Sequence, residues 1–121
     1  MGRHLIAVAL ALACALAGCG PTPPQAPGPQ AHQLNQALST FSTACGHAAE
    51  VKAFSQSAQL IAGLEHLAGA KVGTLARIYH QNRGWYFQGK TVRQLVQMSV
   101  SFLTECGLHR TAARLRQATS G

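Results

Sequence analysis

Side chains able to do acid–base or metal chemistry are scarce in this 121-residue sequence. Its acids are Glu50, Glu65 and Glu105, with no aspartate, so no carboxylate pair suggests acid–base catalysis. Neither a Gly-x-Ser-x-Gly elbow nor a phosphate-binding glycine loop occurs. The histidines show neither an i, i+4 pair nor ligand-like spacing with acids or cysteines. After position 20 they are His32, His47, His66, His80 and His109. We therefore expect no catalytic residue, no metal site and no cofactor. Scattered surface histidines are the favoured interpretation, and a metal site assembled only by the fold is the alternative.

Cys19 follows a segment with the pattern of an export signal. Arg3 and His4 precede an apolar run at residues 5–16, which is short for a spanning helix because that needs roughly 20 residues. Leu16-Ala17-Gly18-Cys19 then resembles the lipobox of bacterial lipoproteins at every position. The resemblance implies that residues 1–18 are a signal peptide. It also implies that Cys19 carries a diacylglycerol thioether and, on its new amine, an acyl chain such as palmitate. Two or three chains anchor a protein durably, whereas one holds it only marginally.

Cys14 and the apolar run itself leave room for a different interpretation of this segment. Cys14 has Ala11 three positions upstream rather than a larger aliphatic residue, so we expect it to be removed with the signal. The run also fits an ordinary secretory signal or an uncleaved anchor helix. Gly20 stands where lipoproteins retained in the inner membrane typically have Asp. The resemblance therefore favours the outer membrane if the host is Gram-negative.

Besides the expected anchor Cys19, the cysteines that remain after such processing are Cys45 and Cys106. Each falls on the apolar side of an expected helix, and export places them in a compartment where thiols can pair. A bridge between them would close a loop of about 60 residues and contribute roughly 4 kcal/mol in the chain-entropy model. We predict a structural disulfide. A redox pair, which lacks the usual Cys-x-x-Cys spacing, and an intermolecular bridge are the alternatives.

Three consecutive aromatic residues stand out in the segment 83–90. Trp85, Tyr86 and Phe87 lie between two glycines and are flanked by Arg83 and Lys90. Trp, Tyr and Arg dominate binding hot spots, and aromatic residues with cations also suit a membrane interface. These five residues are our candidate partner-binding set. In the alternative interpretation, Trp85 and Phe87 fill the core while Tyr86 lies at its rim.

The elements expected to position these residues are helices. All five prolines lie within residues 21–29, so residues 19–30 are expected to form an extended tether that holds the domain roughly 30 Å from the bilayer. Residues 31–121 are expected to form one all-α domain, a small bundle of about four helices stapled by one disulfide. Its size is near the limit at which one core suffices, so a covalent staple helps.

Apolar spacing and local signals mark the helices within that domain. One stripe runs over 34–45, and Gly46 breaks or weakens that helix. A second stripe runs from 51 to 68, with Gly69 and Gly73 at the next join. Apolar residues within 72–79 then predict a short helix that ends near Gly84. The sharpest signals mark a helix over 91–106: Thr91 and Gln94 fit a capping box, and Gly107 fits a left-handed Schellman ending. Residues 111–118 are expected to form a last short helix.

The charge is strongly positive and unevenly distributed. Nine of the ten lysines and arginines follow Cys19, against three glutamates. Outside the cytoplasm such a field suits anionic lipid headgroups, cell-surface polymers or an acidic protein partner rather than nucleic acid. The positions 71, 77, 83, 90 and 93 are cationic with no acid between them. They are interpreted either as a solvated basic face or as an electrostatic docking surface that weakens with salt.

The general plan of anchor, tether and helical domain resembles two groups of small envelope lipoproteins. These are the pilotins that escort secretins to the outer membrane and the exclusion lipoproteins of conjugative plasmids. Gly89-Lys90-Thr91-Val92, at the start of a helix ending in cysteine, is also similar to small disulfide-bonded acid-stress chaperones, although their acid-rich composition is missing. We expect a non-enzymatic interaction module, an accessory or assembly subunit of a secretion, transfer or other envelope machine, with an envelope protein as partner. The alternatives are a periplasmic chaperone or inhibitor that binds unfolded or foreign protein, and a small enzyme.

Overall fold

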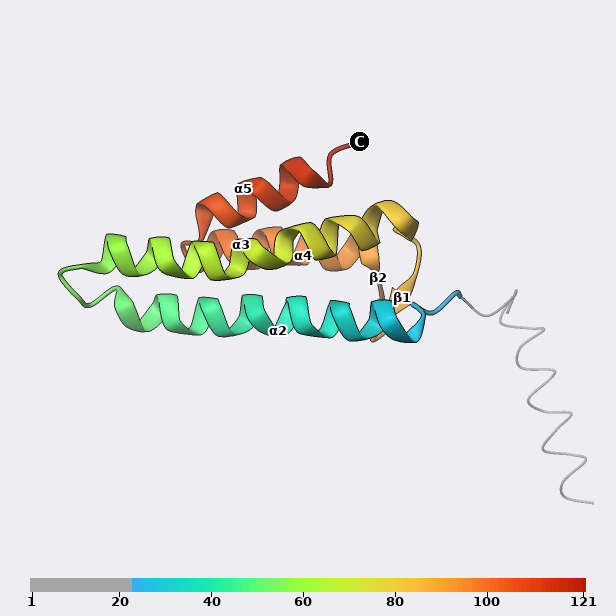
Figure 1. Cartoon of the computed structure of the whole chain (residues 1–121), viewed down its shortest axis with the longest axis horizontal. Helices are drawn as coiled ribbons and strands as arrows, with labels where there is room; N and C mark the ends of the chain where they lie inside the picture. Colours follow the sequence, from blue (N-terminus) through green and yellow to red (C-terminus); the bar gives the residue numbers. More distant parts are fainter. Residues whose placement is uncertain (1–22) are drawn as a thin grey trace, which may run out of the picture.

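The computed structural model describes residues 23–121, which form a small helical bundle with one short hairpin. Its elements are α2 (Gly28–Val51), α3 (Ser57–Asn82), β1 (Tyr86–Phe87), β2 (Lys90–Thr91), α4 (Val92–Glu105) and α5 (His109–Ala118). Figure 1 shows α2 and α3 as a long pair running in opposite directions, with α4 and α5 against them. The all-α prediction is confirmed. The expected signal peptide, the lipobox and Cys19 lie outside the described residues.

Helix α2 begins earlier than the sequence indicated and continues without a break. It starts at Gly28 rather than Ala31 and carries Pro29 in its first turn, where a proline costs little because that N–H has no helical partner anyway. Gly46 lies inside the helix, so of the two effects considered for it, a break or a weakening, the break does not occur. A continuous buried row faces the bundle: Leu34, Ala37, Phe41, Ala44, Cys45 and Ala48.

Helix α3 corrects the expected pattern of joins. The chain reverses at residues 52–56, where Phe54 is exposed, and α3 then runs through both Gly69 and Gly73. The predicted join at these glycines was wrong. Gly69 instead lies where α5 crosses, since a Cβ there would be 2.7 Å from Nη1 of Arg114. Its missing side chain thus leaves room for the end of the Arg114 side chain from α5.

Both predicted ends of α4 are confirmed. The Thr91 hydroxyl accepts a hydrogen bond from the Gln94 N–H at 3.1 Å, and the Gln94 side-chain oxygen accepts one from the Thr91 N–H at 2.8 Å. At the other end Gly107 has φ of 95°, and the Leu108 N–H donates to the Leu103 carbonyl at 2.9 Å. These bonds satisfy backbone groups that a helix end leaves unpaired.

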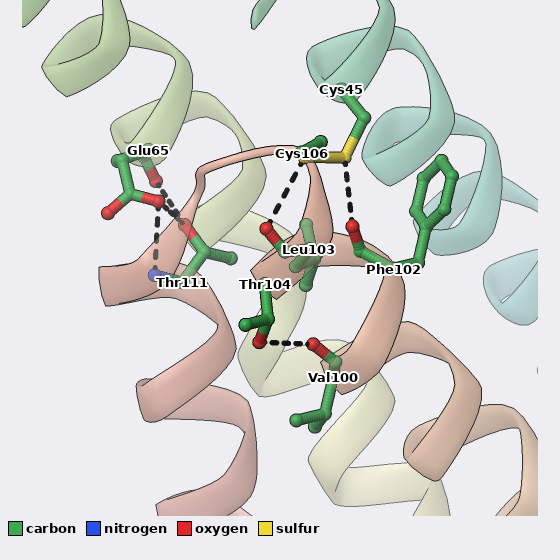
Figure 2. The surroundings of a disulfide bond; sticks show 8 residues. All are labelled: Cys45, Glu65, Val100, Phe102, Leu103, Thr104, Cys106 and Thr111. Atoms are coloured by element: carbon green, nitrogen blue, oxygen red, sulfur yellow. Dashed lines mark hydrogen bonds between the residues drawn. A yellow bond between two sulfur atoms is a disulfide. The ribbon is translucent and has the colours of Figure 1, made fainter.

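The predicted disulfide is present. Cys45 on α2 is bonded to Cys106 at the C-terminal cap of α4, with the two Cα atoms 5.4 Å apart. Figure 2 shows the bridge beside the turn that leads from α4 into α5. Around it the core is aliphatic and aromatic, and its largest fully buried side chains include Phe41, Leu75 and Ile78. The bridge therefore covalently joins the two helices that frame one side of this core.

Glu65 forms a tertiary cap for α5. Helix α5 has no side-chain cap of its own. The Glu65 carboxylate, buried on α3, accepts hydrogen bonds from the backbone N–H groups of Arg110 (2.8 Å) and Thr111 (3.2 Å) and from the Thr111 hydroxyl (3.0 Å). The bonds to Thr111 can be followed in Figure 2. A carboxylate at a helix N-terminus satisfies free N–H groups and interacts favourably with the helix dipole.

The chain upstream of α2 is joined to the hairpin. The Tyr86 N–H donates to the Pro24 carbonyl at 2.8 Å, and the Ala26 N–H donates to the Tyr86 carbonyl at 2.9 Å. Gln25 and Tyr86 thereby form a parallel β-bridge. Residues 24–30 thus belong to the folded domain, whereas the sequence placed them in the tether. The difference arises because extended proline-rich backbone can still pair through the carbonyls and N–H groups that it retains.

Candidate partner-binding site

Most of the predicted aromatic segment packs against the domain. Trp85 and Phe87 are half-buried against the core, and Tyr86 is half-buried beside them as part of β1. Trp85 and Phe87 thus border the buried core, in the direction of the alternative interpretation, but they do not fill it. Contact of these residues with a partner stays a prediction.

The two cations of the predicted set differ in their surroundings. The Arg83 guanidinium donates to the Tyr79 hydroxyl at 3.2 Å and lies 4.7 Å from the centroid of that ring, a cation–π distance. Lys90 is exposed and has no ion pair with any residue between 23 and 121. Arg83 is therefore held on the end of α3, while Lys90 is free to meet a ligand.

An apolar groove lies between α2 and α4, with the hairpin turn at one end. Its volume is about 310 Å³. Leu38 and Phe41 line it from α2, and Leu95, Met98, Ser99 and Phe102 line it from α4. Gln88 and Lys90 border it from the hairpin. The predicted cation Lys90 thus lies beside apolar residues that the candidate set did not include.

Met98 and Phe102 form an exposed ridge along this groove. Their exposed fractions are 50% and 43%, and the spacing of four residues places them on one row of α4. On the far side of the ridge lies a second hollow, lined by Gln97, Ser101 and Glu105 together with the ridge itself. A side-chain row flanked by hollows is the surface that a helix uses to pack against another helix.

The sequence contained a usable signal for this ridge. Leu95, Met98 and Phe102 follow helical spacing beside the buried row of Val92, Val96, Ser99 and Leu103. The apolar face of α4 is therefore wider than its contact with the core. An apolar face wider than the bundle covers would have indicated this exposed ridge.

The turn that borders the groove has unusual backbone geometry. Gln88 and Gly89 have φ of 52° and 81° and connect the paired strands β1 and β2. Positive φ at both central residues is typical of a type I′ hairpin turn, which favours Asn-Gly. Gln88 therefore occupies a left-handed conformation at some energetic cost.

A second cleft lies at the opposite end of the bundle. Its volume is about 430 Å³, and its lining includes Lys52, Ile61, Glu65 and Arg110. Both carboxylate oxygens of Glu65 are already engaged in capping α5. The cleft therefore contains the exposed cations Lys52 and Arg110, and its one acid, Glu65, already caps α5.

The histidines are dispersed over the bundle. His80 Nε2 lies 2.7 Å from the Ala118 carbonyl, and His47 pairs with Glu50 at 3.6 Å. Within residues 23–121 no group of three or more His, Cys, Asp or Glu side chains gathers as metal ligands would. In the same part of the chain, no helix has both the length and the apolar character needed to span a bilayer.

No protein-family model, curated protein or solved structure matches this chain. The chemistry of the groove is therefore the basis for assigning a function.

Proposed function

We propose that this protein is an envelope lipoprotein, anchored in the membrane through acylated Cys19, whose helical domain is a non-enzymatic interaction module. It acts as an accessory or assembly subunit of an envelope machine, at the outer membrane in a Gram-negative host. The observation that carries the proposal is the apolar groove between α2 and α4 with its exposed Met98–Phe102 ridge.

The shape and chemistry of the groove favour an amphipathic helix as the docking element. Such a helix places apolar side chains in a groove at spacings of three and four residues. The groove is apolar along its floor, because Phe41 and Leu95 are buried there.

Two other features support a binding role rather than catalysis. Of the three acids in the chain, Glu65 alone is buried, and its carboxylate caps α5, whereas Glu50 and Glu105 are exposed on the surface. The domain is also held together by a disulfide and by tertiary capping. Such rigidity lowers the ordering cost of binding to a partner.

The test compares two matched pairs of substitutions in the host cell envelope. Met98→Gln with Phe102→Gln removes the ridge. Leu60→Gln with Leu67→Gln is the control on α3, where the exposed fractions of 42% and 50% are nearly the same. After crosslinking and mild detergent extraction, a stoichiometric complex should form with the wild type and the α3 control. We expect the ridge variant to bind about 30-fold more weakly, since each hot-spot contact contributes more than about 1 kcal/mol.

Equal complex formation by both double variants would reject the groove as the docking site. Capture of many unrelated unfolded proteins, together with suppression of aggregation at low pH, would favour the chaperone alternative. Acylation is checked separately by mass spectrometry of the peptide that contains Cys19, and an unmodified cysteine there would reject the anchor.

A further inference from the structure

The point where the chain joins the domain lies at one end of the long bundle. Figure 1 shows the start of α2, the hairpin and the end of α3 together at this end. The two hydrogen bonds of Tyr86 to Pro24 and Ala26 hold the incoming chain against the hairpin. These bonds attach the chain to the domain from Pro24 onward.

The distance from the anchor to this end is therefore short. Five peptide steps separate Cys19 from Pro24, and a fully extended chain spans at most about 3.6 Å per residue, or about 18 Å in all. Helix α2 has 24 residues, so at 1.5 Å per residue the opposite end lies about 36 Å farther along the bundle. Anchoring at Cys19 thus keeps the hairpin end within about 18 Å of the bilayer, whereas the 52–56 end can lie about 36 Å farther away.

The hairpin end carries cations without nearby acids. Arg83, Lys90 and Arg93 are all exposed, and the Arg93 N–H donates to the Arg83 carbonyl at 3.0 Å, which makes these two residues neighbours. None of the three forms an ion pair within residues 23–121. The glutamates lie elsewhere: near the end of α2, in the first half of α3 and at the last residue of α4. Adjacent like charges without counter-charges favour an anionic ligand.

We propose that this hairpin end, the tether face formed by Arg83, Lys90, Arg93 and Tyr86, binds the anionic phospholipid headgroups of the membrane that holds Cys19. The inference rests on the proposed anchoring at Cys19. Basic residues close to an acyl anchor add to its hold on an anionic surface. With the tether face on the bilayer, the bundle points away from the membrane and its groove stays open to a partner.

Trp85 provides an internal reporter because it is the only tryptophan of the chain and adjoins Tyr86. The acylated full-length mature protein is reconstituted into phosphatidylcholine vesicles, with or without 30% phosphatidylglycerol, that carry a spin label on the lipid headgroup. We expect stronger quenching of Trp85 fluorescence with phosphatidylglycerol, and loss of that difference at high salt. A Phe54→Trp, Trp85→Phe variant, which moves the reporter to the opposite end, should show no such difference.

Charge substitutions test the surface itself. Lys90→Gln with Arg93→Gln should remove the extra quenching, whereas Lys52→Gln with Arg110→Gln, an equal charge change at the other end, should leave it unchanged. A Cys19→Ser variant of the whole chain, which cannot be acylated, separates headgroup recognition from anchoring. Co-sedimentation measures the affinity of this variant for phosphatidylglycerol vesicles. Adding Lys90→Gln and Arg93→Gln to it should lower that affinity about 30-fold, at roughly fivefold per cation removed.

If the Lys90→Gln, Arg93→Gln pair and the Lys52→Gln, Arg110→Gln pair had equal effects on quenching and co-sedimentation, headgroup binding by the tether face would be overturned. A different result would reject the anchor alone: Cys19 is found unacylated, but Lys90→Gln with Arg93→Gln still lowers co-sedimentation with the vesicles. Headgroup recognition would then stand without the anchor. The two failures are therefore distinguishable.

Discussion

Substituting Glu65 by glutamine should destabilise the domain although the side-chain shape hardly changes. The carboxylate accepts three hydrogen bonds at the N-terminus of α5, two of them from backbone N–H groups. One carboxylate oxygen accepts the bond from Arg110 and the other accepts the two bonds from Thr111. A glutamine amide has a single oxygen, so the bonds to one of these two residues are lost. A hydrogen bond to a charged acceptor contributes about 1.5–3 kcal/mol, and the helix dipole adds about 0.3–1 kcal/mol.

We therefore expect Glu65→Gln to lower the free energy of unfolding by about 2–3 kcal/mol, and Tm by about 10–15 °C for a domain of this size. Urea denaturation and thermal melts followed by circular dichroism measure both quantities. Glu105→Gln is the matched control, because it removes the same charge from an exposed position at the end of α4. An acid at a helix C-terminus is slightly unfavourable, so this control should be neutral or mildly stabilising.

Hydrogen exchange localises the effect. The amide protons of Arg110 and Thr111 should lose protection in Glu65→Gln before those in the middle of α4. The reasoning would be refuted if the two glutamine variants unfolded within about 0.5 kcal/mol of each other, since that is the usual range of a neutral surface substitution.

Three further predictions concern the disulfide, the hairpin turn and α3. Reduction of Cys45–Cys106, which are 61 residues apart, should cost about 4 kcal/mol; coinciding denaturation curves with and without reductant would contradict this. Gln88→Asn should stabilise the protein by up to about 1 kcal/mol, because Asn tolerates the left-handed conformation of the turn; a lower midpoint in urea would argue against a type I′ turn. Gly73→Ala should also stabilise by about 1 kcal/mol, because a Cβ there meets no atom within 4 Å; marked destabilisation would indicate a break in α3.

Sequence reasoning succeeded where the interactions are local. The capping box joins residues three positions apart, and the left-handed Gly107 ends α4 within one turn, so both could be predicted from short motifs. The disulfide was predictable for a different reason: with the expected loss of Cys14 and acylation of Cys19, one pair of cysteines was left to form it. The predicted join at Gly69 and Gly73 failed, and Gly46 does not break α2. The reason is that a glycine weakens an isolated helix by only about 1 kcal/mol, which tertiary packing readily offsets.

The candidate site was predicted only in part. Lys90 and its neighbouring aromatic residues were identified from composition, and the structure places Lys90 beside the groove. Met98 was missed, because helical spacing shows which residues share a face and not how much of that face the bundle covers. The groove exists only after α2 and α4 are brought side by side.

By itself the sequence determined the helical class, the ends of α4 and the one pair of cysteines able to bridge the domain, because these depend on neighbouring residues or on simple counting. Tertiary structure alone decided that Glu65 caps α5, that Pro24 and Ala26 pair with Tyr86, and that Met98 and Phe102 stay exposed. Each of these depends on groups that are far apart in the chain or on surface that no neighbouring element covers. The physical reason is that local signals choose the conformation of a segment, whereas burial and long-range hydrogen bonds depend on where the other segments lie.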